Sequence, residues 1–440
     1  MFGYLGNSAP RCDVIATQIQ LGFNLTITTI MPSVAATVAT VVVLALGITY
    51  QVYVAPLLTL GGLYRTVEPL NTENCVGIEG IQACESMNRY LKTKSLLKSP
   101  ELVIHPSGLV YLACASSPES RLFWSPAGDY LNATAVRARD SDDYVATYDH
   151  QSHKITKLSV VGLNDPRGLN LHGMDVVVDE HDPNLLWVYL VNHRPPLDAL
   201  VDAHKVGADS VIEVFKTQLG ANSMEWVRTF MDPSIIVTPN DVAGGTNGKE
   251  VWFTNDRQSR IGINRTLHLL FGIKSSSVGY CHTNTGCKIA AGELYASNGI
   301  VRTNEETFWV GSTMGGYVTV HERQADNTLV LTELVKVGLF TDNLSVSPDG
   351  SIIVATFPRV FDLMTKSFKN TSFTAPTSIH RITLNTERRS YFGEKYKIYE
   401  DGGDMGSSAT SAAIYKDTLY LHGFMAHRLQ ICKLPRETLG

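Results

Sequence analysis

The stretch IIVTPNDVAGGTNGKEVWFTNDR, residues 235–257, decides the fold. It carries two amide-plus-acid pairs, Asn240-Asp241 and Asn255-Asp256, on either side of a Gly-rich turn and an apolar strand-like run. Amide and carboxylate oxygens that lie in a loop and return along a strand are the ligands that a hard cation such as Ca²⁺ binds. We therefore predict strands whose ends point oxygen ligands at an ion.

Further oxygen ligands occur later in the chain, at Asn298 in ASNGI and at Asp342-Asn343 in TDNLSVSPDG. An isolated Asn-Asp pair is usually a turn, because both side chains bond their own backbone. The pair at 240–241 remains a ligand candidate because of the motifs that accompany it. The pair at 255–256 is interpreted as structural or as a support for the ligands.

A polar turn followed by a short strand of aromatic and aliphatic residues recurs six times after the apolar N-terminal part. The expected strands are residues 109–114, 185–193, 250–256, 307–313, 351–357 and 418–424. They lie several tens of residues apart, which leaves room for a four-stranded blade around each one. This pattern favours an all-β, six-bladed β-propeller over a β-sandwich with long insertions. Short helices are expected near residues 197–204 and 266–273.

Charge excludes one class of partner. The chain of 440 residues has 37 basic and 42 acidic side chains and a net charge of -5. Nucleic acid binding needs a basic face, so no nucleic acid partner is expected.

The N-terminal part predicts a membrane anchor. Residues 14–64 contain no Asp, Glu, Lys, Arg or His, and residues 34–60 are almost wholly apolar. About 20 apolar residues span a bilayer, and a buried helix or a cleaved signal peptide fits this length less well. We divide the chain into an N-terminal tail (1–33), a transmembrane signal anchor (34–60), a linker (61–74), a propeller hydrolase domain (75–434) and a C-terminal tail (435–440).

The cysteines indicate an oxidising compartment. Of the seven, Cys12 precedes the apolar segment, and six follow it: Cys75, Cys84, Cys114, Cys281, Cys287 and Cys432. An even number beyond the anchor suits disulfides in a lumenal or extracellular domain. Glycosylation sequons at Asn132, Asn264 and Asn370 agree with this side of the membrane. Cys281 and Cys287 are expected to close a small loop, and the partners of Cys84 and Cys114 stay open.

Five motifs occur in an order that resembles a known family. They are HGMD at 172–175, LVNH at 190–193, PNDV at 239–242, SNGI at 297–300 and DNLSVSPDG at 342–350. Over residues 67–434 the chain resembles the serum paraoxonase/arylesterase family. The resemblance implies a six-bladed propeller with two Ca²⁺ ions that hydrolyses lactones and aryl esters, and a closing disulfide between Cys75 and Cys432. A retained hydrophobic N-terminus is also common in that family.

The resemblance assigns roles to individual residues. The ligands implied for the catalytic Ca²⁺ are Glu85, Asn240, Asn298, Asp342 and Asn343. A structural Ca²⁺ is implied at Asp241 and the backbone carbonyl of Met174. His172 and His193 match the histidine pair of the family.

The chain departs from the family beside the first ligand. Glu85 is followed by Ser86, where the family usually has an Asp that binds the structural ion. We interpret residues 87–100 as an insertion, and Glu101 as a rival to Glu85 for the ligand position. Glu85 is preferred because its ACE context directly follows GIEGIQ. Occupancy of the structural site stays open.

The chemistry also follows from the residue types. A divalent cation with an open position stabilises the negative charge that grows on a lactone carbonyl. A neutral imidazole, His172, takes a proton from the attacking water, and His193 holds its ring. No acyl-enzyme is expected, and the substrate is a small lactone or ester. Two alternatives remain: an enzyme that resembles strictosidine synthase and needs no metal, and a non-catalytic, membrane-tethered binding propeller.

Overall fold

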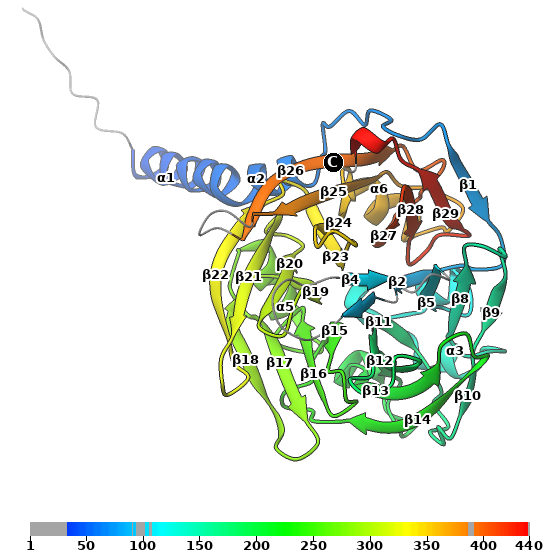
Figure 1. The fold of residues 1–440 in the computed structure, drawn as a ribbon. Helices are drawn as coiled ribbons and strands as arrows, with labels where there is room; N and C mark the ends of the chain where they lie inside the picture. Colours follow the sequence, from blue (N-terminus) through cyan, green and yellow to red (C-terminus); the bar gives the residue numbers. More distant parts are fainter. Residues whose placement is uncertain (1–32, 90, 94–101, 105–107, 386–390, 439–440) are drawn as a thin grey trace, which may run out of the picture. The chain divides into compact units, whose positions relative to one another are not determined.

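The computed structural model describes residues 33–438 apart from 90, 94–101, 105–107 and 386–390. The chain divides into two units, Met1–Tyr50 and Gln51–Gly440. In the larger unit, six mainly antiparallel sheets of four or five strands follow one another around a ring (Figure 1). The first strands of neighbouring sheets contact one another and enclose the axis. The described residues therefore form a six-bladed β-propeller, as the sequence predicts.

The strands of each sheet run in order from the axis outward. The first sheet is β2 (Cys84–Arg89), β5 (Leu109–Cys114), β8 (Tyr144–Asp149) and β9 (Ile155–Lys157), and the second is β11 (Leu171–Val178), β12 (Leu185–Arg194), β13 (Asp209–Gln218), β14 (Ser223–Phe230) and β10 (Ser159–Val161). The third is β15 (Pro239–Gly244), β16 (Glu250–Asn255), β17 (Ser276–His282) and β18 (Gly286–Leu294), and the fourth is β19 (Ser297–Arg302), β20 (Thr307–Ser312), β21 (Tyr317–Arg323) and β22 (Leu329–Lys336). The fifth is β23 (Phe340–Val346), β24 (Ile352–Phe357), β25 (Thr377–Leu384) and β26 (Phe392–Asp401), and the sixth is β27 (Ser411–Tyr415), β28 (Thr418–His422), β29 (Leu429–Lys433) and β1 (Cys75–Ile78).

The remaining elements are short. Two-stranded ladders join β3 (Leu91–Thr93) to β4 (Leu102–Ile104) and β6 (Trp124–Ser125) to β7 (Tyr130–Leu131). The helices of the larger unit are α2 (Ala55–Leu60), η2 (Glu119–Leu122), η3 (Pro126–Gly128), α3 (Ala133–Arg137), α4 (Ala203–Val206), α5 (Ile263–Leu270), α6 (Val360–Asp362), η4 (Leu363–Ser367) and η5 (Arg436–Thr438).

The six predicted strands are β5, β12, β16, β20, β24 and β28, the second strand of each sheet. These strands are buried on both faces because each blade packs against two neighbours. Six apolar clusters fill the interfaces between successive blades. Aromatic pairs also cross these interfaces, such as Trp252 of the third blade with Phe308 of the fourth. Burial on both faces explains why these strands read as continuous apolar runs in the sequence.

The N-terminal strand closes the ring. β1 pairs with β29 in the last sheet, with Cys75 opposite Cys432, and a disulfide joins the two residues. This confirms the closing disulfide that the family resemblance implies. Two further disulfides join Cys84 to Cys114 and Cys281 to Cys287. All six cysteines beyond the apolar segment are therefore paired.

The apolar N-terminal segment is helical. α1 (Val34–Thr49) continues through the π-helical turn η1 (Tyr50–Val54) into α2. Residues Val34–Leu60 form one helix that is long and apolar enough to cross a membrane. Its bounds match the predicted anchor of residues 34–60.

Two details differ from the sequence predictions. The helix expected near residues 197–204 is only the four-residue α4, because Leu197 and Leu200 are 72% and 93% exposed and have no apolar surface to pack against. Met87, the first residue of the insertion expected at 87–100, is buried and extends β2 opposite Leu112. Glu101, the rival ligand, lies outside the described residues.

Candidate catalytic centre on the propeller axis

Five of the six innermost strands carry a β-bulge, and the bulges bracket the predicted site residues. The strand registers shift between residues 84 and 86, 171 and 174, 239 and 242, 297 and 300, and 341 and 344. A bulge leaves a residue outside the ladder and redirects its side chain. Besides Gly173 and Gly299, the residues inside these bulges are Glu85, His172, Asn240, Asp241, Asn298, Asp342 and Asn343. The sixth inner strand, β27, keeps an unbroken register and has no predicted ligand.

Four of the predicted ligands line one cavity. Glu85, Asn240, Asn298 and Asp342 border a space of about 300 Å³ together with His172. The Oδ1 atoms of Asn240, Asn298 and Asp342 are buried and make no hydrogen bond within the described part of the chain. A buried acceptor without a partner costs about 1–3 kcal/mol. Three such oxygens from three different strands at one cavity indicate that they have a shared partner.

Charge repulsion is concentrated at Asp342. Its pKa is raised well above the usual range by burial and then by the negative charges of Glu85 and Asp241, and a hydrogen bond from Asn298 only partly opposes this. Buried carboxylates that repel one another are stabilised by a cation or by a proton. The donor set contains only oxygens, two of its members being carboxylates and the others amides, which is the chemistry of a Ca²⁺ site.

Close backbone packing holds the strands that carry Asn298 and Asp342 together. A Cβ atom at Gly299 would lie 2.7 Å from Asn343 Cα and 2.9 Å from the Asp342 carbonyl oxygen, so only glycine fits beside Asn298. Within the described residues, no group of three or more His, Cys, Asp or Glu side chains has the arrangement of a metal site. The predicted set depends on amide oxygens instead, and its unpartnered oxygens fit a hard cation.

Asn343 supports Glu85 in this structure. Its Nδ2 donates hydrogen bonds to the Glu85 carbonyl oxygen at 2.9 Å and to Ser411 Oγ at 3.1 Å. The hydroxyls of Thr410 and Ser411 donate to the same carbonyl at 2.8 and 2.7 Å. Three donors from two neighbouring blades thus fix the backbone at the first predicted ligand.

The residues implied for a second ion lie at a separate cavity of about 130 Å³, lined by Ser86, Met174, Asp175 and Asp241. Burial raises the pKa of Asp241 to about 8, and the charges of Asp175 and Glu85 add to the effect. Asp241 Oδ2 accepts a hydrogen bond from the Ile300 N–H at 3.0 Å, whereas Oδ1 has no partner among the described residues. Ser86 Oγ donates to the Met174 carbonyl oxygen at 3.2 Å, so a hydroxyl already contacts that predicted ligand. The fit to a second cation is therefore only partial.

The two predicted histidines are in direct contact. His172 Nδ1 lies 2.9 Å from His193 Nε2, and His172 Nε2 lies 3.5 Å from Glu85 Oε1. His193 Nδ1 lies 2.8 Å from Ser210 Oγ. Burial, and then the neighbouring His172, Arg121 and Arg265, lower the pKa of His193 well below its usual value, which favours the neutral ring. If His193 donates from Nδ1 to Ser210 and accepts from His172, the lone pair of His172 is at Nε2, the nitrogen on the side of Glu85.

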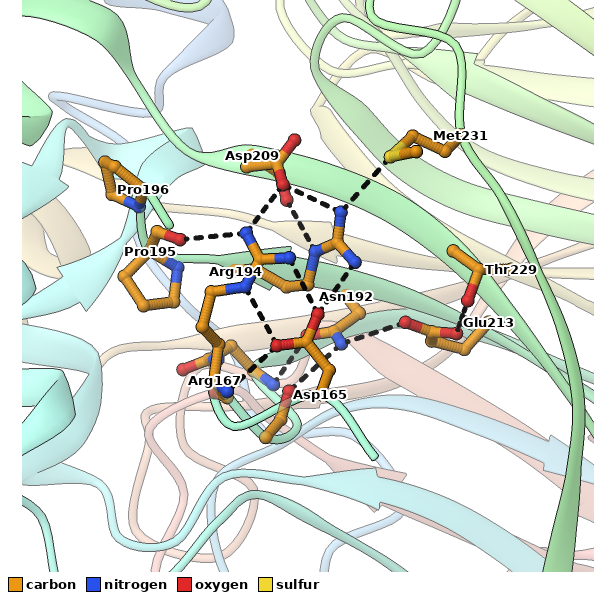
Figure 2. Close-up of polar contacts among 12 residues, drawn as sticks. Asp165, Arg167, Asn192, Arg194, Pro195, Pro196, Asp209, Glu213, Thr229 and Met231 are labelled. Carbon is orange, nitrogen blue, oxygen red and sulfur yellow. Dashed lines mark hydrogen bonds and ion pairs between the residues drawn. The ribbon is translucent and has the colours of Figure 1, made fainter. Parts of the chain in front are cut away.

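Figure 2 shows an ion-pair network of Asp165, Arg167, Arg194 and Asp209, in which Arg194 directly follows His193 in the chain and Asp209 directly precedes Ser210. Arg167 and Arg194 each place a guanidinium nitrogen 2.7 Å from Asp209 Oδ2, and both also contact Asp165. Hydrogen bonds from Arg167 lower the pKa of Asp165 to about 2, so that carboxylate stays ionised. Asn192 completes the frame: its Oδ1 accepts from the Asn170 N–H at 2.8 Å and its Nδ2 donates to the Gly168 carbonyl oxygen at 3.1 Å. The network thereby positions the chain just before His172.

Two residues of this centre have no sequence motif. Ser210 lies opposite His193 in the β12–β13 ladder, and Arg121 lines both the main cavity and a smaller one that His172 and His193 also line. Asn255 has the structural role that the sequence predicts. Its Oδ1 accepts hydrogen bonds from the N–H groups of Val237 and Thr238, both at 3.0 Å.

Comparisons with known proteins agree with these observations. Residues 137–434 match the family model described as Arylesterase. The chain is similar to serum paraoxonase/arylesterase 2 of Gallus gallus, with 22% identity over 84% of this chain and 91% of that protein. It is also similar to serum paraoxonase/arylesterase 1 of Rattus norvegicus, with 21% identity over 84% and 92%. Among solved structures, a luciferin-regenerating enzyme aligns with 82% of this chain and 95% of its own at 11% identity, and the TM-score of 0.43 is too low to support an argument about function.

Proposed function

This chain belongs to the arylesterase family, and we propose that it is a Ca²⁺-dependent hydrolase of lactones and aryl esters. Family membership makes it an esterase or lactonase rather than a non-catalytic binding module. The observation that carries the Ca²⁺ assignment is the set of three unpartnered oxygens, from Asn240, Asn298 and Asp342, at the same cavity as His172.

In this proposal, the chain's own residues have separate tasks. Glu85, Asn240, Asn298, Asp342 and Asn343 would hold the ion. When bound, Ca²⁺ acts as a Lewis acid toward the substrate carbonyl. His172 Nε2 takes a proton from the water that attacks this carbonyl, and the contact with His193 fixes the orientation of the ring. His172 returns this proton to the alcohol oxygen as the bond between that oxygen and the acyl carbon breaks. An ester then yields an alcohol and an acid, a lactone yields a single hydroxy acid, and the new acid group loses its proton to solvent to become a carboxylate.

The cavity walls supply the substrate preference. Beyond the polar residues, the walls include the apolar side chains of Phe340, Phe357, Leu363, Met364, Phe368 and Phe424. Such walls bury an aryl or alkyl group and exclude water from the reacting carbonyl. This lining supports a substrate that is apolar apart from its ester or lactone group.

We also propose a location. The helix Val34–Leu60 would act as an uncleaved signal anchor, and the propeller would lie on the lumenal or extracellular side. The pairing of all six cysteines of the larger unit supports an oxidising compartment. In this proposal, residues 61–74 are the linker between the anchor and the propeller, and residues 75–434 are the hydrolase domain.

Chelation tests the proposed function. Treating the full chain with EDTA is expected to lower the hydrolysis of an aliphatic lactone and of an aryl ester by at least about 100-fold, about 2.7 kcal/mol of transition-state stabilisation. Adding Ca²⁺ should restore both activities. Mg²⁺ should not, because it is smaller and demands a regular octahedral site. Undiminished turnover in EDTA would instead favour the metal-independent enzyme class.

A further inference from the structure

Arg121 is a buried arginine beside the catalytic centre. It lies on the 3₁₀ helix η2 and is 6% exposed. Its Nη1 donates to the Leu171 carbonyl oxygen at 2.7 Å, and its Nη2 donates to the Ala83 carbonyl oxygen at 3.3 Å. Its Nε has no partner among the described residues. Because a guanidinium has five N–H donors, most of its bonding capacity is unused.

Other buried arginines of this chain have carboxylate partners. Arg194 pairs with Asp165 and Asp209 (Figure 2), and Arg265 and Arg381 pair with Asp129 and Asp349. Arg121 takes part in none of the ion pairs found in the described part of the chain. Burying a charge without a partner is costly. The contrast indicates that the partner of Arg121 comes from outside the chain.

The two carboxylates that share the smaller cavity with Arg121 have other partners. Glu85 and Asp143 line the smaller cavity with it. Asp143 pairs with Arg139 at 3.0 Å and accepts hydrogen bonds from the N–H groups of Ser116 and Leu171. In the proposed function, Glu85 and Asp342 together balance the two charges of one Ca²⁺. The positive charge of Arg121 therefore remains uncompensated at the site.

The position of this charge matches the reaction. Arg121 contacts the carbonyl of the residue before His172 and lines the main cavity together with His172 and Glu85. Hydrolysis of any ester or lactone creates a carboxylate where none existed before. Guanidinium groups bind carboxylates strongly, by charge-assisted hydrogen bonds.

We propose that Arg121 binds the carboxylate group of the acid product. This inference rests on the proposed function, because it places the ester or lactone carbonyl in the main cavity. The ligands that the centre binds most tightly are then carboxylic acids with an apolar aryl or alkyl tail. Such acids should inhibit the enzyme, whereas neutral compounds of the same shape should bind weakly.

A matched pair of ligands tests the proposal. We would titrate the Ca²⁺-loaded full chain with 3-phenylpropanoate and with 3-phenylpropanamide, which have the same shape and differ in charge, by calorimetry. The wild type is expected to bind the acid at least about tenfold more tightly than the amide. Arg121→Gln and Arg121→Met should reduce this ratio to about one, and Arg121→Lys should keep a ratio of at least about threefold. A purely structural role would weaken both ligands alike and leave the ratio unchanged.

Arg381→Gln is the matched control, because Arg381 is equally buried but outside the cavity, and it should keep the wild-type ratio. Equal affinities of the wild type for the acid and the amide would overturn the proposal. This outcome is measured on the wild type alone and does not depend on whether any variant folds. A full acid preference in folded Arg121→Gln would also overturn it, since the ion would then supply the preference. Binding is measured without turnover. A wild type that hydrolyses esters and lactones but shows no preference for the acid would therefore refute the role of Arg121 and leave the proposed function intact.

Discussion

Replacing Asp342 with Asn is expected to lower lactone and ester hydrolysis by at least about 100-fold, because one of the two carboxylates that hold the ion is lost. The substitution conserves the shape of a side chain that is 6% exposed, so the bulge in β23 should persist. Ca²⁺ affinity, measured by equilibrium dialysis with radioactive calcium, should fall together with activity.

The same substitution should have the opposite effect on the metal-free protein. Burial and the charges of Glu85 and Asp241 raise the pKa of Asp342, so the ionised carboxylate destabilises the fold at neutral pH when no cation is present. An amide removes that repulsion. Asp342→Asn should therefore melt at a higher temperature than the wild type in EDTA, and at a lower temperature than the wild type in Ca²⁺.

Asp326→Asn is the control for this pair of measurements, because Asp326 lies in an exposed turn between β21 and β22. It should change neither activity nor the response to Ca²⁺. If Asp342→Asn kept wild-type activity or affinity for Ca²⁺, the assignment of Asp342 as a ligand would be wrong.

Replacing His172 with Gln should lower kcat by about 100- to 1000-fold and leave Ca²⁺ affinity unchanged, because general-base catalysis contributes on this order. His193→Gln should have a smaller effect, about tenfold, since His193 acts through its 2.9 Å contact with His172. KM should change little in both variants. Steady-state kinetics at saturating Ca²⁺, together with dialysis, would separate loss of the base from loss of the ion.

His321→Gln provides the matched control. His321 is buried on β21, where its Nε2 contacts Thr319 Oγ1, and it does not line the main cavity. Its replacement should leave kcat intact. Full lactone turnover by His172→Gln would show that another group activates the water, even if the fold and the ion are as described.

The fold could be predicted because one strand of each blade carries an unusually clear pattern. β24 and β28 are buried along their whole length between two neighbouring blades, which selects apolar residues at consecutive positions. The inner strands give a weaker signal, because β15 and β23 interrupt their apolar residues with Asn and Asp. None of the six strands predicted from the sequence is an inner strand.

The site could be predicted only in part. The sequence motifs name the candidate residues, but the five bulges that direct their side chains toward the axis cannot be predicted from the motifs. Ser210 could not be found from the sequence, because its contact with His193 depends on the register of β12 and β13 across a long connection. Arg121 was equally hidden, since its partners are backbone carbonyls from two other segments.

The helix expected near residues 197–204 shows how a local pattern can mislead. Its apolar positions are spaced as in an amphipathic helix, but the segment has no apolar surface beneath Leu197 and Leu200. Asp198 and Asp202 bond the backbone N–H groups of Leu200 and His204 instead, and these contacts favour turns.

Anomalous diffraction from a crystal grown in Ca²⁺ would test the central claim most directly. We predict an anomalous peak on the propeller axis, within about 2.3–2.6 Å of oxygens from Glu85, Asn240, Asn298 and Asp342. The absence of a peak there, with those oxygens accepting hydrogen bonds from water or from protein donors, would contradict the proposed Ca²⁺ centre.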